Sequence, residues 1–71
     1  MERKSFWEIF KVYPDGSIEP LRSVRIGGVQ FGPGVRFGKG VSFSGIDLTL
    51  YVGRDLQIEQ VNGIATLKGI Y

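Results

Sequence analysis

Residues 28–45 repeat one six-residue unit three times, as GVQFGP, GVRFGK and GVSFSG. Each copy has glycine and valine, then one variable position, then phenylalanine. Valine and phenylalanine are two positions apart, so in an extended segment both side chains point to the same side. The Gly-Pro, Gly-Lys and Ser-Gly steps that follow interrupt each strand and turn the chain. The repeat therefore predicts three short strands with equal corners, which are the elements of a coil or of a tight meander.

The spacing V-x-F-G-x-G-V-x-F-G resembles the hexapeptide repeat of left-handed β-helix proteins, in which an aliphatic residue precedes glycine at each corner. The resemblance covers residues 28–45 and implies a triangular coil. This chain has phenylalanine where that family has isoleucine, leucine or valine, and three rings at one level of a narrow coil would compete for space. One coil has no neighbours on which to stack, and the histidine on which the family's common acyl-transfer activity depends is absent. We therefore expect a short-stranded meander, with the coil as the alternative.

The glycines of this segment do not match the known phosphate-binding loops. A P-loop requires glycine, four residues and then Gly-Lys-Ser/Thr. Here Gly34 and Gly38 are separated by three residues, and no hydroxyl follows Lys39. The dinucleotide fingerprint also fails, because neither Gly-x-Gly step is followed by glycine three residues later. We expect the glycines at corners that need a positive φ angle.

Residues 5–19 are expected to form a β-hairpin. The Pro-Asp-Gly sequence at 14–16 supplies the turn, since proline presets the first corner and glycine accepts the left-handed position. The return strand ends at Pro20 or lies at an edge, because proline cannot donate to a ladder. Two cross-strand pairs follow from this turn: Val12 with Ile18, and Lys11 with Glu19.

The first strand of this hairpin is expected to be apolar on both faces. In a hairpin with one solvated face, polar and apolar residues alternate, so a second apolar face needs a cover. The cover is either the rest of the domain or another subunit, and we take Trp7 and Tyr13 as candidate self-association residues. In an extended segment 5–13 the apolar side chains form two sets: Phe6, Phe10 and Val12 on one face, and Trp7, Ile9 and Tyr13 on the other.

A second hairpin is expected at the C-terminus, where Asp55–Val61 and Ile64–Tyr71 flank Asn62-Gly63. Asn-Gly is the strongest short hairpin signal, because both turn positions need a positive φ angle. Between the two hairpins, residues 46–52 fit either a strand or a short helical turn. The two-residue loop predicts this arrangement: Glu59 opposite Thr66 and Gln57 opposite Lys68 on the solvated face, and Leu56, Ile58, Ala65 and Leu67 on the apolar face.

These segments predict an all-β fold in one small domain, residues 1–71. It is a small barrel or sandwich built from the N-terminal hairpin, the glycine-rich short-stranded meander and the C-terminal Asn-Gly hairpin. The core of a chain this short is marginal, although 42% of the residues are hydrophobic. There is no cysteine for a disulfide or a thiolate metal site, and no histidine as a zinc ligand. Small domains are commonly stabilised by disulfides, a metal ion or oligomerisation. Because the first two are not expected here, we expect a homo-oligomer.

No apolar run approaches the roughly 20 residues that span a bilayer. The N-terminal sequence MERKSFWEIF lacks the long apolar stretch and the cleavage site of a signal peptide. We expect a soluble cytoplasmic chain that makes no membrane contact.

Charge is unevenly distributed, although the net charge is only +2. All seven acidic residues lie outside residues 20–46. Cations that follow a phosphate backbone, interleaved with aromatic rings that stack on bases, are typical of proteins that bind single strands. The alternative is that the phenylalanines belong to the core and the cations are solvated on the outer side. The candidate polyanion-binding residues are the four cations of this segment: Arg22, Arg25, Arg36 and Lys39.

Catalysis, a cofactor and a metal ion are not expected. There is no histidine or cysteine, and a domain this small has little room for a deep pocket. Asp47 and Asp55 with Arg54 could form a cluster, for which a structural salt bridge is the expected role. Four more carboxylates are scattered: Glu8, Asp15, Glu19 and Glu59.

Two functions therefore fit the sequence. The first is a small non-enzymatic interaction module that self-associates or docks on a protein partner. The alternative is a small basic β-barrel that binds single-stranded nucleic acid through residues 20–46.

Overall fold

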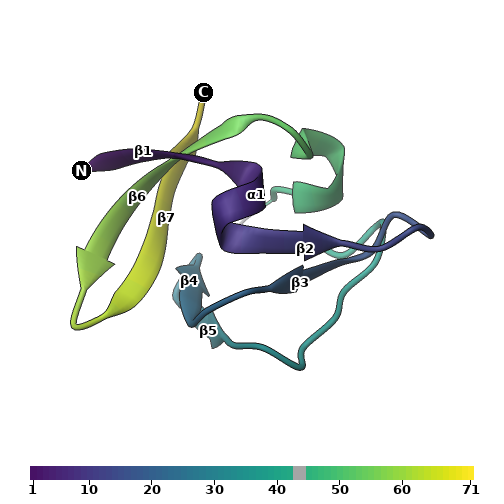
Figure 1. Cartoon of the computed structure of the whole chain (residues 1–71), viewed down its shortest axis with the longest axis horizontal. Helices are drawn as coiled ribbons and strands as arrows, with labels where there is room; N and C mark the ends of the chain where they lie inside the picture. The colour runs from purple at the N-terminus through teal and green to yellow at the C-terminus, as the bar shows by residue number, and fades with distance from the viewer. Residues whose placement is uncertain (43–44) are drawn as a thin grey trace.

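The computed structural model describes residues 1–42 and 45–71 of the chain (Figure 1). A mixed five-stranded sheet has the order β1-β6-β7-β4-β5, and β2 pairs with β3 in a second sheet. β4 and β7 run parallel, and the other paired strands run antiparallel. The all-β prediction is confirmed, and closure of the strands into a barrel or sandwich stays a prediction. The elements are β1 (Glu2–Ser5), α1 (Phe6–Ile9), β2 (Phe10–Val12), β3 (Ile18–Pro20), β4 (Val24–Ile26), β5 (Val29–Phe31), the 3-10 helix η1 (Leu48–Tyr51), β6 (Asp55–Val61) and β7 (Ile64–Ile70).

The expected continuous strand over residues 5–13 is wrong, because the chain makes the helical turn α1 between β1 and β2. The amide of Ser5 donates to Glu8 Oε2 at 2.8 Å, as in a capping box at the start of a helix. In a helical turn, residues three apart share a face, so Phe6 and Ile9 are both buried. Trp7 is 55% exposed. The helical turn thus buries Ile9 instead of leaving it beside Trp7.

The predicted pairing of β2 with β3 is confirmed, with Val12 opposite Ile18 and Lys11 opposite Glu19. At the turn, Gly16 has a φ angle of +89°. β3 ends at Pro20, as expected for a residue that cannot donate to a ladder.

The C-terminal hairpin is confirmed around Asn62 and Gly63, whose φ angles are +52° and +79°. Glu59 lies opposite Thr66 as predicted, but Gln57 lies opposite Gly69 instead of Lys68. A β-bulge adds Lys68 to β7 as an extra residue. The extra residue reverses the alternation of faces, so that Ile70 comes opposite Leu56 and packs against the core.

The corners of the six-residue repeat have the predicted positive φ angles: +82° at Gly28, +97° at Gly34 and +92° at Gly40. Two successive corners make the same turn. The Val35 amide donates to the Gly32 carbonyl at 3.2 Å, and the Val41 amide donates to the Gly38 carbonyl at 3.3 Å.

The expected row of three strands forms only in part. The first copy of the repeat is β5, whereas the second contributes one isolated bridge, between Phe37 and Ile18. Phe43 of the third copy lies outside the described residues.

In β5 the prediction that valine and phenylalanine share one side is confirmed, because Val29 and Phe31 lie opposite the buried Ile26 and Val24 on one face of the sheet. In the first two copies the valine is nevertheless more exposed than the phenylalanine. Phe37 is buried and Phe31 is half-buried, whereas the valines are exposed: Val29 by 49%, Val35 by 43% and Val41 by 41%.

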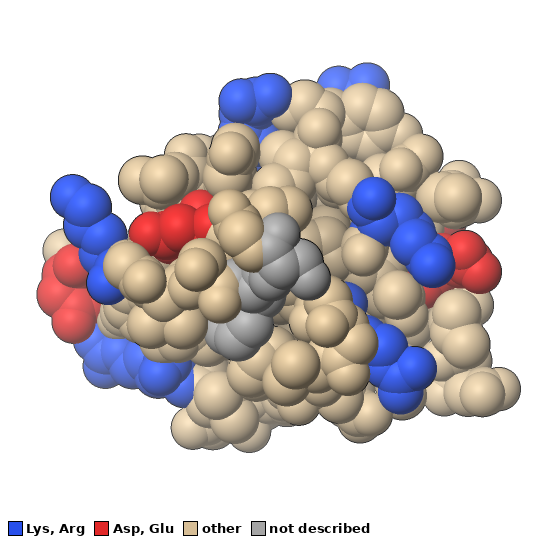
Figure 2. All heavy atoms as spheres, turned by 180° about the vertical axis from the view of Figure 1, so that it is seen from behind, with Lys and Arg blue, Asp and Glu red and all other residues tan. Residues whose placement is uncertain are grey.

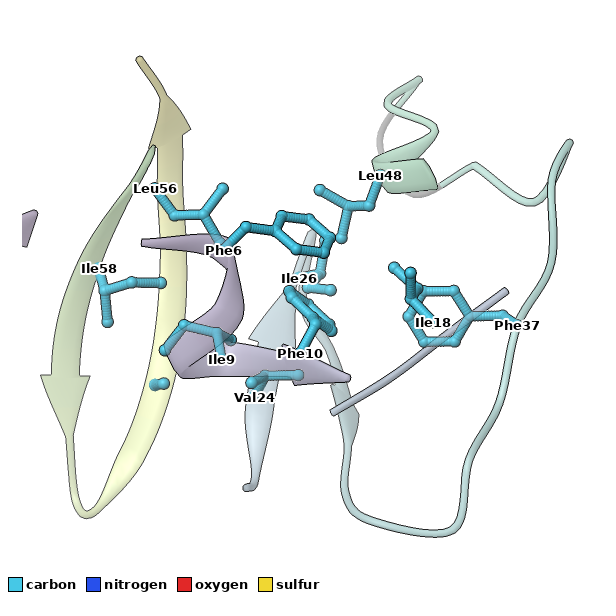
Figure 3. Packing of buried hydrophobic residues seen from close by; sticks show 11 residues of the cluster. Phe6, Ile9, Phe10, Ile18, Val24, Ile26, Phe37, Leu48, Leu56 and Ile58 are labelled. Carbon is cyan, nitrogen blue, oxygen red and sulfur yellow. The ribbon is translucent and has the colours of Figure 1, made fainter. Parts of the chain in front are cut away.

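The core lies between the five-stranded sheet and the α1–β2–β3 segment (Figure 3). The Phe10 ring stacks on Phe6 with ring centroids 4.9 Å apart and meets Phe37 edge-on at 6.4 Å. Such ring pairs add about 0.5–1.5 kcal/mol to the stabilisation from buried area. Residues 46–52, which the sequence left open, contain η1, and its Leu48 is buried. The buried cluster comprises Phe6, Ile9, Phe10, Ile18, Val24, Ile26, Phe37, Leu48, Leu56, Ile58 and Ala65.

Candidate interaction surface

Arg36, a predicted polyanion-binding residue, is engaged within the chain. Its Nη2 lies 2.9 Å from Asp15 Oδ2, and its Nε donates to Ser17 Oγ at 2.6 Å. Its guanidinium carbon stands 3.7 Å from the centroid of the Tyr13 ring, within cation–π range. An acidic residue of the N-terminal hairpin, Asp15, therefore covers part of Arg36.

The other candidate cations contact different parts of the chain. Arg22 Nη2 donates to Gln60 Oε1 at 3.1 Å. Arg25 is exposed on β4, and Lys39 is exposed at a corner. Hydrogen bonds from the Thr49 side chain and the Gly40 amide lower the pKa of the nearby Asp47, and the charge of Lys39 adds to this effect. On the face seen in Figure 2, lysine and arginine side chains are dispersed among uncharged and acidic surface. The contacts of the described residues do not gather the four cations into one patch.

Tyr13, a candidate self-association residue, is held by its own chain. Its hydroxyl donates to Glu19 Oε1 at 2.5 Å, and this hydrogen bond raises the pKa of Tyr13. Lys11 Nζ lies 4.9 Å from the ring centroid, and the Arg36 guanidinium also stands over the ring. Of the two candidates, Trp7 is therefore the one whose side chain is more open to a second molecule.

Two carboxylates accept hydrogen bonds from the backbone at equivalent corners of the repeat. Glu19 Oε2 accepts the Gly34 amide at 2.9 Å, and Asp47 Oδ2 accepts the Gly40 amide at 2.8 Å. Hydrogen bonds from Tyr13 and then from the Gly34 amide lower the pKa of Glu19. Sequence reasoning treated Glu19 as a scattered carboxylate and Asp47 as part of a possible cluster, and it missed this role.

The structural role of Asp15 and Asp47 is indicated by a short sequence pattern. Asp15 accepts the amide and hydroxyl of Ser17, and Asp47 accepts the amide and hydroxyl of Thr49. Both are Asp-x-Ser/Thr turns, in which the side chain bonds to the backbone two residues later. This pattern is visible in the sequence and indicates a structural role for both aspartates.

Asp47, Asp55 and Arg54, which the sequence allowed as a cluster, have other partners among the described residues. Asp55 Oδ2 pairs with Arg3 Nε at 2.7 Å, and Arg54 Nε donates to the Tyr71 carbonyl oxygen at 2.6 Å. Over residues 1–42 and 45–71, no three acidic residues are grouped so that they could hold a metal ion.

Acidification is expected to destabilise the fold through Asp15. Hydrogen bonds from Ser17 lower the pKa of this carboxyl from 3.8 to about 2. As the pH falls, the unfolded chain therefore takes up its proton first, and stability declines between about pH 4 and pH 2. The melting temperature of the parent, followed from neutral pH into this range, should fall more than that of Asp15→Asn. An identical pH dependence in the two proteins would contradict this role of Asp15.

A shallow pocket of about 210 Å³ lies between β7 and the turn that joins β4 to β5. Its lining is apolar except for one lysine, so few polar groups are available to orient a ligand. The lining residues are Ile26, Gly27, Ile46, Leu67, Lys68, Gly69 and Ile70.

Large apolar side chains are numerous at the surface. Besides the valines at equivalent positions of the three repeat copies, they include an aromatic side chain on α1 and a leucine on η1. Contiguous apolar patches are typical of surfaces that meet another macromolecule, whereas single exposed apolar side chains are normal on a monomer. The large apolar residues exposed in the described part of the chain are Met1, Trp7, Leu21, Val29, Val35, Val41, Leu50, Val61 and Tyr71.

No helix in the part of the chain that the structure describes is long and apolar enough to cross a membrane. Comparisons with protein-family models, with curated proteins and with solved structures found no match for this chain.

Proposed function

We propose that this chain is a small non-enzymatic interaction module that works by self-association. The observation that carries the proposal is the exposure of Val29, Val35 and Val41, which occupy the same position in each copy of the repeat. Phe37 is buried and Phe31 is half-buried, so the valines remain as a set of exposed apolar side chains for a second molecule. A short chain without a disulfide gains stability when a partner covers such groups. Docking on a different protein is the other form of the same proposal.

The alternative function, binding of single-stranded nucleic acid, gains less support from the geometry. The Asp15 carboxylate partly neutralises Arg36, and Asp15 and Ser17 already accept from two of its nitrogens, which weakens its attraction for a phosphate. Arg22 already donates one N–H to Gln60. We therefore favour the interaction module.

Sedimentation across a dilution series tests the proposal. We expect the weight-average mass to rise above the 7.9 kDa of the single chain as the concentration goes from low micromolar to millimolar. A mass that stays at 7.9 kDa throughout the series would contradict self-association. Adding a single-stranded oligonucleotide at low salt is the control, because non-specific phosphate contacts are strongest there. A rise in mass only with the oligonucleotide would favour the alternative.

A further inference from the structure

The five-stranded sheet has two edges, and they differ in charge. β1 forms one edge and carries Glu2, Arg3 and Lys4, whereas β5 forms the other and reads Val29-Gln30-Phe31. An edge strand presents unpaired backbone groups, and charged side chains commonly prevent it from pairing with another chain. β5 lacks this protection.

The backbone of Gln30 faces the open side of β5. Gly27 and Gly28 form a two-residue turn with φ angles of +56° and +82°, and Ile26 pairs with Val29 across it. The pair that closes such a turn exchanges both hydrogen bonds, and the next pair makes none. The next pair is Arg25 with Gln30, so the N–H and C=O of Gln30 point away from β4. In the described chain, β4 is the one strand that pairs with β5.

We propose that β5 pairs antiparallel with β5 of a second copy, about a two-fold axis at Gln30. The proposal rests on the proposed function of self-association and names its contact. The two Gln30 residues exchange backbone hydrogen bonds, and their side-chain amides lie opposite each other on the solvated face. Pairing in this register joins the two five-stranded sheets edge to edge.

The side chains of β5 fit this register. Val29 lies opposite Phe31 of the second copy, and the symmetry repeats the pair. Cross-strand pairs between aromatic and β-branched residues stabilise a sheet. No like charges face each other in β5. The composition of β5 therefore favours a second copy at this edge.

The dimer is expected to be weak. Three residues from each strand bury far less than the roughly 800 Å² per partner that is standard for specific complexes. The dimer population should therefore rise with concentration rather than saturate at micromolar levels.

Two substitutions at Gln30 test the pairing by sedimentation. Proline removes the N–H, which the monomer does not use for pairing with β4, and an edge strand tolerates proline where its N–H faces solvent. Gln30→Ala keeps the N–H and is the matched control. We expect Gln30→Pro to weaken dimerisation at least about tenfold, because two hydrogen bonds are lost per dimer. Gln30→Ala should stay within about two-fold of the parent.

A charge pair at the same position gives a test that does not depend on proline. Gln30→Lys and Gln30→Glu each place like charges opposite each other, so each protein alone should dimerise more weakly than the parent. A mixture of the two should dimerise more tightly than either alone, because opposite charges then face each other. Association of the parent that is unchanged in Gln30→Pro, or a mixture no tighter than its components, would overturn the β5 contact alone. A parent that is monomeric at every concentration would overturn the proposed function as well.

Discussion

Replacing Phe6 by alanine is expected to lower the free energy of unfolding by about 3–5 kcal/mol. Phe6 is fully buried, and its ring stacks on Phe10. Alanine would remove this contact and leave a cavity in a core that has little material with which to fill it. Small domains are stable by about 5–15 kcal/mol, so the loss is a large share of the total. Denaturant unfolding of parent and variant measures it.

Trp7→Ala is the matched control, because it truncates the neighbouring aromatic residue. Trp7 meets Phe6 edge-on with ring centroids 6.1 Å apart, but 55% of it is exposed. We expect a loss below about 1 kcal/mol. Equal losses at the two positions would contradict the helical turn α1, which buries one ring and leaves the other at the surface.

Gly63→Val is expected to lower the free energy of unfolding by about 1–3 kcal/mol. Gly63 has a φ angle of +79° in the turn between β6 and β7, a conformation that a β-branched residue adopts only under strain. A β-carbon at this position would meet no atom within 4 Å, so the cost comes from the backbone and not from a clash. The midpoint of urea unfolding should fall without a change in slope.

Gly38→Val is the control for this prediction. A β-carbon at Gly38 also meets no atom within 4 Å, and its φ angle lies outside the left-handed range. The same substitution should therefore change stability by less than about 1 kcal/mol. A loss at Gly38 as large as that at Gly63 would show that the turn conformation is not the cause.

The hairpins were predictable because local chemistry determines them. Asn62-Gly63 specifies a two-residue turn, and that turn sets the pairing of Glu59 with Thr66. The bulge at Lys68 was not predictable from the turn, because it depends on where Ile70 must point to reach the core.

The sequence contains a signal for the helical turn that replaces the predicted strand over residues 5–13. Ser5 and Glu8 have the spacing of a capping box. In the folded chain this capping box starts a helical turn, although the run of apolar residues also suits a strand. The sequence pattern Phe6, Ile9 and Phe10 is helical in spacing, but four residues are too few for periodicity to distinguish a helix from a strand.

The repeat predicted the positions of the corners but not how deeply each valine and phenylalanine is buried. Glycine at the first position of each copy predicted the positive φ angles, which Gly28, Gly34 and Gly40 have. How deeply each side chain is buried depends on contacts far away in the sequence, such as the bridge between Phe37 and Ile18. The pairing of Arg36 with Asp15 is of the same kind, since 21 residues separate them.

The exchange rate of the Gln30 amide hydrogen, measured by NMR at increasing protein concentration, tests most directly whether this chain associates through β5. In the monomer this N–H points to solvent, so it should exchange fast at low concentration. Pairing with a second copy protects it, and we expect exchange to slow as the concentration rises. The Val29 amide, which faces Ile26 across the turn, should be protected at every concentration. A Gln30 amide that exchanges at the same fast rate throughout the series would contradict the account.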